Sequence, residues 1–427
     1  MDSPRFSGVV IPFARVTPEK TFNFWLRKWT ALAFLRGILG AQWLVSRIVR
    51  CVFDRGRERN KHSICSVMLT GTFYSENWVM NHLRPLANSP ACSRVWLISN
   101  ISIPSVAKVQ TIPIPPWLRK LTGQTIARLL VFVIAAIRYR PDIVGGFHLL
   151  VNGLVASLVA PVIRARSIYF CGGGPLEVLG GGFYADNRLF DLLRVPDEVL
   201  ERQLIRAVGQ CDLVITMGSR TIDFFQGRGV NTRFEIVPGG IDGVRYQDRG
   251  EPKTFDLIFV GQLIPIKRVD LFLEIVKCVA EKHPDVNAVV VGTGRLEESL
   301  RAMAFQLGIQ DRVTFAGYQA DVAPWLNKSK LLLLTSDSEG LSLAMMEAML
   351  CGLPCIVSDV GELGELIEHG VNGYLVKERS APAFSECVVP LLQDNQMWQR
   401  LSGAARVSAA RYETPATTER WTALLRS

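Results

Sequence analysis

The sequence predicts an α/β protein of two domains, and three observations lead to that prediction. The chain has 427 residues, enough for two domains that each bury a core of ordinary size. Hydrophobic residues make up 48% of it and glycine fills 35 positions, a composition typical of folded α/β proteins rather than disordered chains. From residue 63 onward, short apolar runs typical of buried strands alternate with helical patterns.

The first 62 residues differ from the rest in charge. They hold twelve Lys or Arg and four acids, so they carry +8 of the chain's net +9, and the other 365 residues carry about +1. Four of the five basic side chains within residues 22–53 share one side of a helical wheel, and they are Lys28, Arg36, Arg47 and Arg50. This segment is predicted to be a basic amphipathic helix that binds an anionic membrane surface.

Two alternatives remain open for this segment. It could be two helices broken near Gly37 and Gly40, or a helix packed on the neighbouring domain. A membrane span is not expected, because the charge-free run between Arg36 and Arg47 has only ten residues. A signal peptide is not expected either, because no small-residue cleavage site follows.

Residues 63–237 are predicted to form the first α/β domain. Its strands are expected at 64–73, 95–99, 142–147 and 211–216, the last being the final strand, and its helices at 78–87, 126–138 and 219–230. The uncharged run 143–163 is interpreted as a strand, loop and helix rather than a span, because glycine, histidine, asparagine and proline interrupt it. His148 follows the strand at 142–147, at the carboxyl edge where open parallel sheets bind ligands. Two glycine triplets, 172–174 and 180–182, suggest that the backbone comes close to a ligand, and the acceptor is the natural candidate.

The most informative stretch is 336–354, SDSEGLSLAMMEAMLCGLP. A turn-rich entry precedes an apolar helix that ends at Gly352 and Pro354. Glu339 and Glu347 are eight residues apart, a helical interval of roughly 12 Å. Free N–H groups near Gly340, Leu341 and Ser342 would face an anion at the helix N-terminus. Amides for phosphates and carboxylates for flanking hydroxyls suit a nucleotide diphosphate-sugar, although an N-cap acid followed by an ordinary helix glutamate explains the spacing equally well.

Several segments in a fixed order resemble the retaining glycosyltransferases of family 4, also called glycosyl transferases group 1. Residues 339–354 are similar to that family's E-x7-E signature and the EAM-x-CG-x-P that follows it. Four further segments resemble its motifs, and they are FEIVPGGID (234–242), FVGQLIPIKRVDLFLE (259–274), VVVGTGRLEESLR (289–301) and VTFAGY (313–318). The resemblance covers roughly residues 212–376. It implies the GT-B fold, in which two Rossmann-like domains face across a cleft.

The resemblance also implies roles for individual residues. Glu339, Lys267 and His148 are the expected catalytic residues, with Glu339 on the donor-sugar hydroxyls, Lys267 on the diphosphate and His148 directed at the sugar. The expected donor-binding residues are Glu347 on the ribose hydroxyls, Arg268, Gln262, Gly340, Leu341, Ser342, Gly292, Gly294 and Tyr318. Gln262 stands where the family usually has arginine, and Arg268 is the candidate replacement for that cation.

The expected domain boundaries follow from the charge distribution, from the Gly-, Pro- and Asp-rich stretch 238–255 and from the resemblance to this family. An N-terminal extension (1–62) precedes the acceptor-side domain (63–237), a linker (238–255) and the nucleotide-sugar domain (256–411). A C-terminal helix (412–427) returns to the first domain. The acceptor is expected to be a glycan or a lipid-linked sugar at the cytoplasmic face of a membrane.

Composition excludes some other classes. The basic charge is not spread along the chain as a nucleic-acid-binding face requires, so no nucleic-acid partner is expected. No Asp-x-Asp occurs and the nine cysteines lack metal-ligand spacing, including Cys351 and Cys355, so neither a metal nor a cofactor is expected. A dinucleotide oxidoreductase lacks its fingerprint. A sugar-nucleotide epimerase of the same architecture and a non-catalytic subunit stay open as alternatives.

Overall fold

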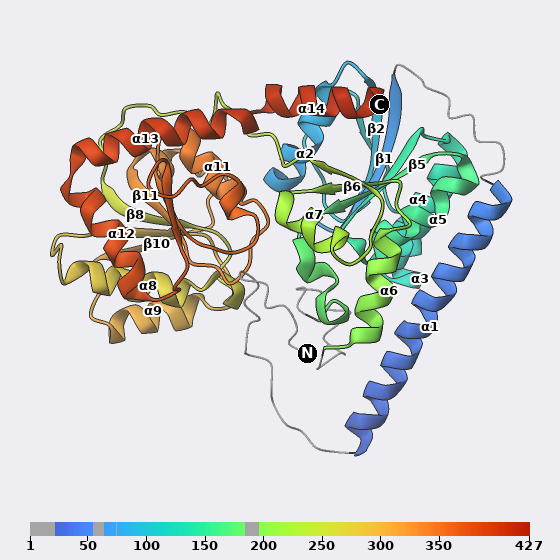
Figure 1. The fold of residues 1–427 in the computed structure, drawn as a ribbon, viewed down its shortest axis with the longest axis horizontal. Coiled ribbons are helices and arrows are strands. Elements are labelled where there is room, and N and C mark those ends of the chain that lie inside the picture. The colour runs from blue at the N-terminus through green and yellow to red at the C-terminus, as the bar shows by residue number, and fades with distance from the viewer. Residues whose placement is uncertain (1–21, 54–63, 74, 184–195) are drawn as a thin grey trace. The chain divides into compact units, whose positions relative to one another are not determined.

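The computed structural model describes the backbone of residues 22–53, 64–73, 75–183 and 196–427. The chain divides into two compact units. The N-terminal unit extends to Gly240 and also includes Thr417–Ser427, and the C-terminal unit comprises Ile241–Ala416. Each unit is built on one sheet, and every strand pairing in both sheets is parallel (Figure 1). The residues predicted as a linker, 238–255, fall on both sides of this division.

The N-terminal unit holds a seven-stranded sheet of order β3-β2-β1-β4-β5-β6-β7. Its strands are β1 (Cys65–Gly71), β2 (Cys92–Ser99), β3 (Val109–Thr111), β4 (Ile143–Phe147), β5 (Arg166–Cys171), β6 (Leu213–Thr216) and β7 (Arg233–Ile236). The central strands β1 and β4 are buried along nearly their whole length, as expected of a parallel sheet covered on both faces. Cys211–Thr216 was predicted to hold the final strand, and that prediction is wrong, because β7 pairs with β6 beyond it. β7 has only four residues and is half-exposed at the sheet edge, so it lacks the apolar signal of a buried strand.

Helices cover both faces of this sheet. They are α1 (Phe22–Phe53), α2 (Glu76–Asn88), α3 (Pro116–Thr122), α4 (Gln124–Tyr139), α5 (Leu154–Ile163), α6 (Glu198–Val208), α7 (Ser219–Gln226) and α14 (Thr414–Arg426). α2 and the end of α14 pack on one face, where Trp421 and Leu424 join the core formed with Val67 and Ile168. α4, α5, α6 and α7 contribute to the cores on the other face. The uncharged run 143–163 therefore forms β4, a short irregular turn (Leu149–Gly153) and α5 inside an α/β unit.

α1 is one continuous helix that passes through Gly37 and Gly40 without a break. It packs against α5 and α6, with Leu39 buried in the core there. Arg36 forms an ion pair with Asp197, and the Gln42 amide donates a hydrogen bond of 3.0 Å to Gln210. The helix thus packs on its neighbouring domain, while the membrane contact predicted for residues 1–62 also concerns 1–21 and 54–62, which lie outside the described residues. No helix in the described part of the chain is long and apolar enough to cross a membrane.

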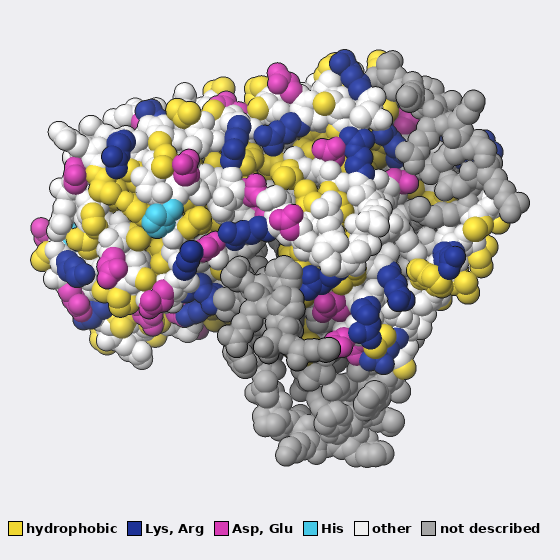
Figure 2. Space-filling model, viewed as in Figure 1, with side chains coloured by type: hydrophobic (Ala, Val, Ile, Leu, Met, Phe, Trp, Pro, Cys, Tyr) yellow, Lys and Arg dark blue, Asp and Glu magenta, His cyan; other side chains and the backbone are white. Residues whose placement is uncertain are grey.

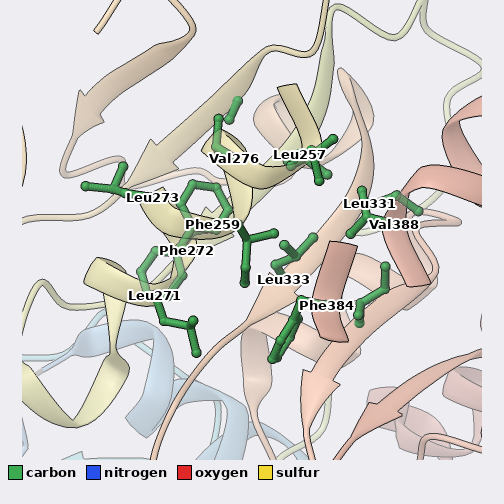
Figure 3. Packing of buried hydrophobic residues seen from close by; sticks show 14 of the residues in the cluster. Leu257, Phe259, Leu271, Phe272, Leu273, Val276, Leu331, Leu333, Phe384 and Val388 are labelled. Carbon is green, nitrogen blue, oxygen red and sulfur yellow. The ribbon is translucent and has the colours of Figure 1, made fainter. Parts of the chain in front are cut away.

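The C-terminal unit holds a six-stranded sheet of order β10-β9-β8-β11-β12-β13. Its strands are β8 (Phe255–Val260), β9 (Ala288–Val291), β10 (Val313–Gly317), β11 (Ser329–Leu334), β12 (Cys355–Ser358) and β13 (Gly373–Val376). Its helices are α8 (Val269–Ala280), α9 (Glu297–Gln306), α10 (Ala323–Asn327), α11 (Leu343–Leu350), α12 (Ala381–Gln393) and α13 (Asn395–Ala409). Figure 3 shows the core between the sheet, α8 and α12, where the rings of Phe259 and Phe272 lie 5.9 Å apart and Leu333 and Phe384 are fully buried.

Candidate functional site

The strand order of each sheet defines a point where ligands bind in open parallel sheets. In the C-terminal unit β8 and β11 are neighbours, and the chain continues from β8 to β9 on one side and from β11 to β12 on the other. In the N-terminal unit β1 and β4 have the same relation. In open parallel sheets the loops that follow such a pair of strands run in opposite directions at the carboxyl edge, and ligands bind there. The predicted catalytic residues lie in these loops, Lys267 after β8, Glu339 after β11 and His148 after β4.

In the C-terminal unit the structure brings Lys267 and Glu339 together. The Lys267 Nζ lies 2.6 Å from Glu339 Oε1, and the same oxygen accepts a hydrogen bond of 2.6 Å from the Ser336 hydroxyl. The Glu339 side chain is only 8% exposed, whereas Lys267 is 24% exposed. The Thr335 hydroxyl fixes the two loops together by donating to the carbonyl groups of Lys267 and Arg268. A cation and a carboxylate 72 residues apart in sequence are thereby held at one point of the sheet edge.

Arg268 lies beside Lys267 but is already paired. Its guanidinium contacts Asp270 at 3.0 Å and Asp337 at 3.4 Å, and Asp337 also pairs with Arg379 at 2.7 Å. Burial raises the pKa of Asp337 above its usual value, although the two arginines oppose that shift. The sequence analysis missed Asp337 and Arg379. Asp337 belongs to the turn-rich segment that precedes the helix in the 336–354 stretch, so the sequence offered a signal for it. Its pairing with Arg379 depends on the fold.

The backbone before α11 is suited to an anion. Ser342 is the N-cap of α11 and its hydroxyl accepts from the Met345 N–H. Within the described residues, the N–H groups of Gly340, Leu341 and Ser342 have no protein acceptor. Such donors at a helix N-terminus attract phosphate or carboxylate groups. This arrangement is the one the sequence analysis expected at these three positions.

Gly361, which follows β12, lies directly against the backbone of Glu339. Gly361 has φ +54°, and a Cβ atom there would lie 1.7 Å from the Glu339 carbonyl oxygen. Any other residue would displace the backbone of Glu339, because that contact is far shorter than van der Waals distance. Gly361 is therefore part of the support of the Glu339 loop, a role that the sequence analysis did not assign.

Glu347 lies in the second turn of α11 and is only 3% exposed. It shares a hydrogen bond with the phenol of Tyr246, which is itself 2% exposed. Burial and then the charge of Glu347 raise the pKa of Tyr246 well above its usual value, so the phenol stays protonated and its O–H donates a hydrogen bond to the carboxylate. The sequence analysis expected Glu347 to meet ribose hydroxyls. The structure shows that Tyr246, from the predicted linker, orients this carboxylate.

The remaining predicted donor-binding residues lie in the loops after β8, β9 and β10. Gln262 is exposed in the loop after β8, and Tyr318 follows β10 and is 73% exposed. Gly292 and Gly294 let the loop after β9 pack directly on the loop after β8. Their Cβ atoms would lie 1.9 Å from the Gly261 carbonyl oxygen and 2.3 Å from that of Leu263. The sequence analysis expected these glycines to be donor-binding residues, and in the structure their close contact is with this neighbouring loop.

In the N-terminal unit His148 is paired with a carboxylate that the sequence analysis missed. The Nδ1 atom of His148 lies 3.0 Å from Glu177 Oε1, so Nδ1 carries the proton and Nε2 is left for a ligand. Glu177 is 7% exposed and also accepts hydrogen bonds from the N–H groups of Leu149 (2.9 Å) and Gly173 (2.7 Å) and the Tyr169 hydroxyl (2.8 Å). The first glycine triplet, 172–174, thus supplies one of the backbone donors to Glu177. Nothing in the sequence pairs a glutamate 29 residues away with His148.

The ionisation of this pair follows from its contacts. Burial opposes the charged imidazole, but the Glu177 carboxylate outweighs it and raises the pKa of His148 above its usual value. For Glu177, burial raises the pKa, but His148 and the backbone donors lower it below the usual value. The Trp78 ring lies nearly parallel to the His148 ring, with 6.3 Å between the ring centroids, and its centroid is 4.2 Å from that of the His82 ring. Burial lowers the pKa of His82 to about 4, so His82 is neutral at pH 7 and His148 is the imidazole of this cluster that gains a proton more readily.

A buried cation lies beneath the loops after β1 and β4. Arg128 of α4 is 1% exposed and donates to the hydroxyls of Thr70 and Thr72 and to the Asn152 side-chain oxygen, at 2.7–3.0 Å. Burial lowers the pKa of its guanidinium to about 10, which still leaves it charged at neutral pH. It therefore adds positive potential at the carboxyl edge of this sheet.

Comparison with known proteins identifies the class to which this architecture belongs. HepE of Anabaena, solved in complex with UDP, superposes with a TM-score of 0.64 at 18% identity, covering 84% of this chain and 99% of that one. Two parallel α/β units with this overall likeness define the GT-B fold of glycosyltransferases. Residues 254–394, which hold Lys267, Glu339 and Glu347, match the sequence model of the family described as glycosyl transferases group 1. This part of the chain is a glycosyl transferases group 1 domain.

Curated relatives agree with this family. An uncharacterised glycosyltransferase of Haemophilus influenzae is 28% identical over 222 residues, which are 51% of this chain and 62% of that protein. N-acetyl-alpha-D-glucosaminyl L-malate synthase of Bacillus anthracis is 35% identical over 153 residues, which are 36% of this chain and 40% of that protein. The chain thus matches less than two thirds of the length of these two relatives.

Proposed function

We propose that this protein is a retaining glycosyltransferase that moves a sugar from a nucleotide diphosphate-sugar to an acceptor. The observation that carries the proposal is the grouping after β8 and β11, where the Lys267–Glu339 pair adjoins the donor N–H groups before α11. An ammonium and backbone amides suit the charge that develops on a departing diphosphate. The carboxylates of Glu339 and Glu347 suit sugar and ribose hydroxyls. The relatives named as glycosyltransferases and the UDP complex of HepE support this assignment.

The acceptor belongs to the N-terminal unit in this proposal. We assign it the chemistry of a glycan or lipid-linked sugar of a cell-envelope polysaccharide or glycolipid, used at the cytoplasmic face of a membrane. The absence of disulfides among the nine cysteines, all of which the structure describes, suits a reducing compartment. His148 would contribute its Nε2 toward the donor sugar, with Glu177 holding its orientation through Nδ1.

Binding of the donor is the first test. Nucleoside diphosphates and a panel of nucleotide sugars should raise the temperature of thermal unfolding, since a ligand that binds only the folded state stabilises it by about 2.7 kcal/mol at a hundredfold excess over Kd. The matched nucleoside monophosphate serves as the control, because it offers the same base and ribose without the diphosphate. Protection by nicotinamide dinucleotides and by no nucleotide sugar would contradict the proposal. Release of nucleoside diphosphate without any acceptor would instead favour the epimerase.

Stereochemistry and metal dependence form the second test. The proposed reaction lets the acceptor attack from the face that the diphosphate leaves, so a leaving phosphate oxygen takes the acceptor proton and no dedicated base is needed. The product should therefore keep the anomeric configuration of the donor, which proton NMR of the new linkage measures. Because the chain contains no Asp-x-Asp, activity should persist in excess EDTA. An inverted product would contradict the retaining assignment, whereas loss of activity on chelation would contradict only the role given to Lys267 and the amides.

A further inference from the structure

The outward face of the N-terminal unit is unusually apolar. Among the residues that the structure describes, twenty large hydrophobic side chains are exposed, and fourteen of them lie on α1, α3, α4 and α5. They are Ile38, Trp43, Leu44, Val45, Ile48, Val52, Trp117, Leu121, Ile126, Leu130, Ile134, Ile137, Tyr139 and Val162. These helices adjoin one another, because α3 packs on α4, and α5 packs on both α4 and α1. Exposed apolar residues scattered singly need no explanation, but a concentration on adjoining helices indicates a surface that is covered in use.

α4 shows the feature most clearly. Its inner face, with Phe132, Ala135 and Ala136, is buried in the core against the sheet. Its outer face carries Ile126, Leu130, Ile134 and Ile137, which are 41–64% exposed and recur every three or four residues. A helix on the outside of an α/β unit normally turns polar residues to water, and one that is apolar on both faces has a partner on each.

The charges on these helices have one sign. α1, α3, α4 and α5 contain no Asp or Glu at all. Residues 101–176 hold one acid, Asp142, which binds the Ser66 N–H and hydroxyl, and eight basic residues, Lys108, Arg119, Lys120, Arg128, Arg138, Arg140, Arg164 and Arg166. The net charge of about +1 over residues 63–427 therefore conceals a strongly basic segment. In Figure 2, a group of yellow hydrophobic side chains with a dark-blue basic patch lies where Figure 1 places the upper part of α1.

We propose that the outer faces of α3 and α4, with the exposed face of α1 alongside, contact an anionic lipid bilayer. The short helix α3 presents Trp117 and Leu121 together with Arg119 and Lys120, a combination that suits the headgroup boundary of a membrane. Each basic residue near an anionic surface contributes attraction, and no carboxylate on these helices opposes it.

A second copy of this chain fits the surface less well. In a two-fold dimer the same patch would meet itself, and its arginines and lysines would face one another without carboxylates between them. A bilayer with anionic lipids supplies both the apolar layer and the opposite charge. The inference rests on this surface and not on the proposed sugar transfer, so either could fail without the other.

Flotation of the full-length chain with vesicles tests the inference. The chain should bind vesicles of phosphatidylcholine mixed with phosphatidylglycerol more tightly than vesicles of phosphatidylcholine alone. Salt that shortens the Debye length below about 8 Å should weaken that binding. Replacing Arg119 and Lys120 by glutamine should lower the affinity about fivefold for each charge, the equivalent of ~1 kcal/mol per basic residue.

Paired substitutions locate the surface. The double variant Leu130→Glu with Ile134→Glu should lower vesicle affinity at least about tenfold, because two apolar side chains leave the layer and two like charges enter it. Leu44→Glu with Ile48→Glu makes the same change on α1. The control is Phe305→Glu with Val407→Glu, which alters the net charge equally at positions 71% and 78% exposed in the C-terminal unit, and it should bind as the unsubstituted chain does.

The outcomes separate the occupants. Retained binding by the α4 variant, whether the α1 variant binds or not, would overturn the proposal for α3 and α4. Absence of vesicle binding combined with a dimer in solution that the α4 variant dissociates would assign the surface to a second copy and overturn the bilayer. Equal thermal unfolding temperatures for the variants and the unsubstituted chain show that a loss of binding does not come from misfolding.

Discussion

Replacing Lys267 by alanine is expected to lower turnover about 100-fold or more. Loss of one preorganised group that stabilises developing charge typically has an effect of this size. The structure places the Lys267 ammonium 2.6 Å from Glu339, the residue that directly precedes the free N–H groups before α11, where the proposal puts the diphosphate. Steady-state rates with the nucleotide sugar identified by thermal protection measure the effect. The loss should lie mainly in kcat, because the charge on the diphosphate grows as the sugar leaves.

A matched lysine provides the control. Lys330 also pairs with a largely buried carboxylate, Asp256, at 2.9 Å in the same unit, but it lies at the beginning of β11, the end opposite to the site loops. Lys330→Ala should therefore lose an ion pair of similar burial and keep near-normal turnover. In Lys267→Ala the buried Glu339 carboxylate keeps the hydrogen bond from Ser336 but loses its cationic partner. That loss should lower the free energy of unfolding by about 1–3 kcal/mol. Rates have to be compared at a temperature where circular dichroism shows both variants folded, and equal rates there would exclude the assigned role.

Replacing Glu177 by alanine is expected to lower the free energy of unfolding by about 3 kcal/mol. The substitution strands four donors that now meet this carboxylate, namely His148 Nδ1, the Leu149 and Gly173 N–H groups and the Tyr169 hydroxyl. Urea denaturation measures the change. Glu198→Ala serves as the control, because Glu198 is 90% exposed and pairs only loosely with Arg202, so the change there should stay within about 0.5 kcal/mol.

Glu177→Gln isolates the charge from the shape of this side chain. Glutamine keeps the length but removes the negative charge that raises the pKa of His148, so burial should then lower that pKa below about 6.5. The sign of the pH effect follows from both shifts. The stabilisation that comes from the raised pKa of His148 is complete below about pH 6.5 and is lost as the pH rises through the folded-state pKa. The stabilisation that comes from the lowered pKa of Glu177 is complete above about pH 4.3 and is lost as the pH falls through the folded-state pKa.

The stability difference between the unsubstituted chain and Glu177→Gln should thus be largest between about pH 4.5 and 6.5 and should shrink at higher pH. Urea denaturation across this range measures it, and NMR of the His148 imidazole reports its pKa directly. An unchanged His148 pKa in the glutamine variant would show that the carboxylate does not set the protonation of this ring.

The sequence was sufficient for the class of fold because its signals are local. Continuous apolar runs such as 331–334 identify buried parallel strands without any knowledge of their neighbours. The Gly352 and Pro354 stop after α11 is a backbone preference of those residues themselves. The eight-residue interval between Glu339 and Glu347 is likewise a property of one loop and one helix. Where the local signal is weak, as in the short, half-exposed β7, the prediction failed.

Only the tertiary structure decided which side chains meet. Glu177 and His148 are 29 residues apart, and Asp337 and Arg379 are 42 apart, so no periodicity connects them. Their pairing depends on which strands are neighbours and, for Glu177, on a backbone donor from the first glycine triplet. The same holds for Arg268, which the sequence offered as a phosphate cation and the fold pairs with Asp270 and Asp337.

The outer face of α4 marks the same limit. Its apolar residues can be recognised in the sequence. From sequence alone, however, a helix with two apolar faces cannot be distinguished from a helix that is buried on both sides. Burial against a sheet on one side and exposure on the other are consequences of packing between elements distant in the chain. For this protein the sequence therefore determined the α/β class, some of the strands and helices, and the motif of the C-terminal unit. The fold determined which charges are paired and which apolar surface is left exposed, because ion pairs and burial are properties of the assembled layers.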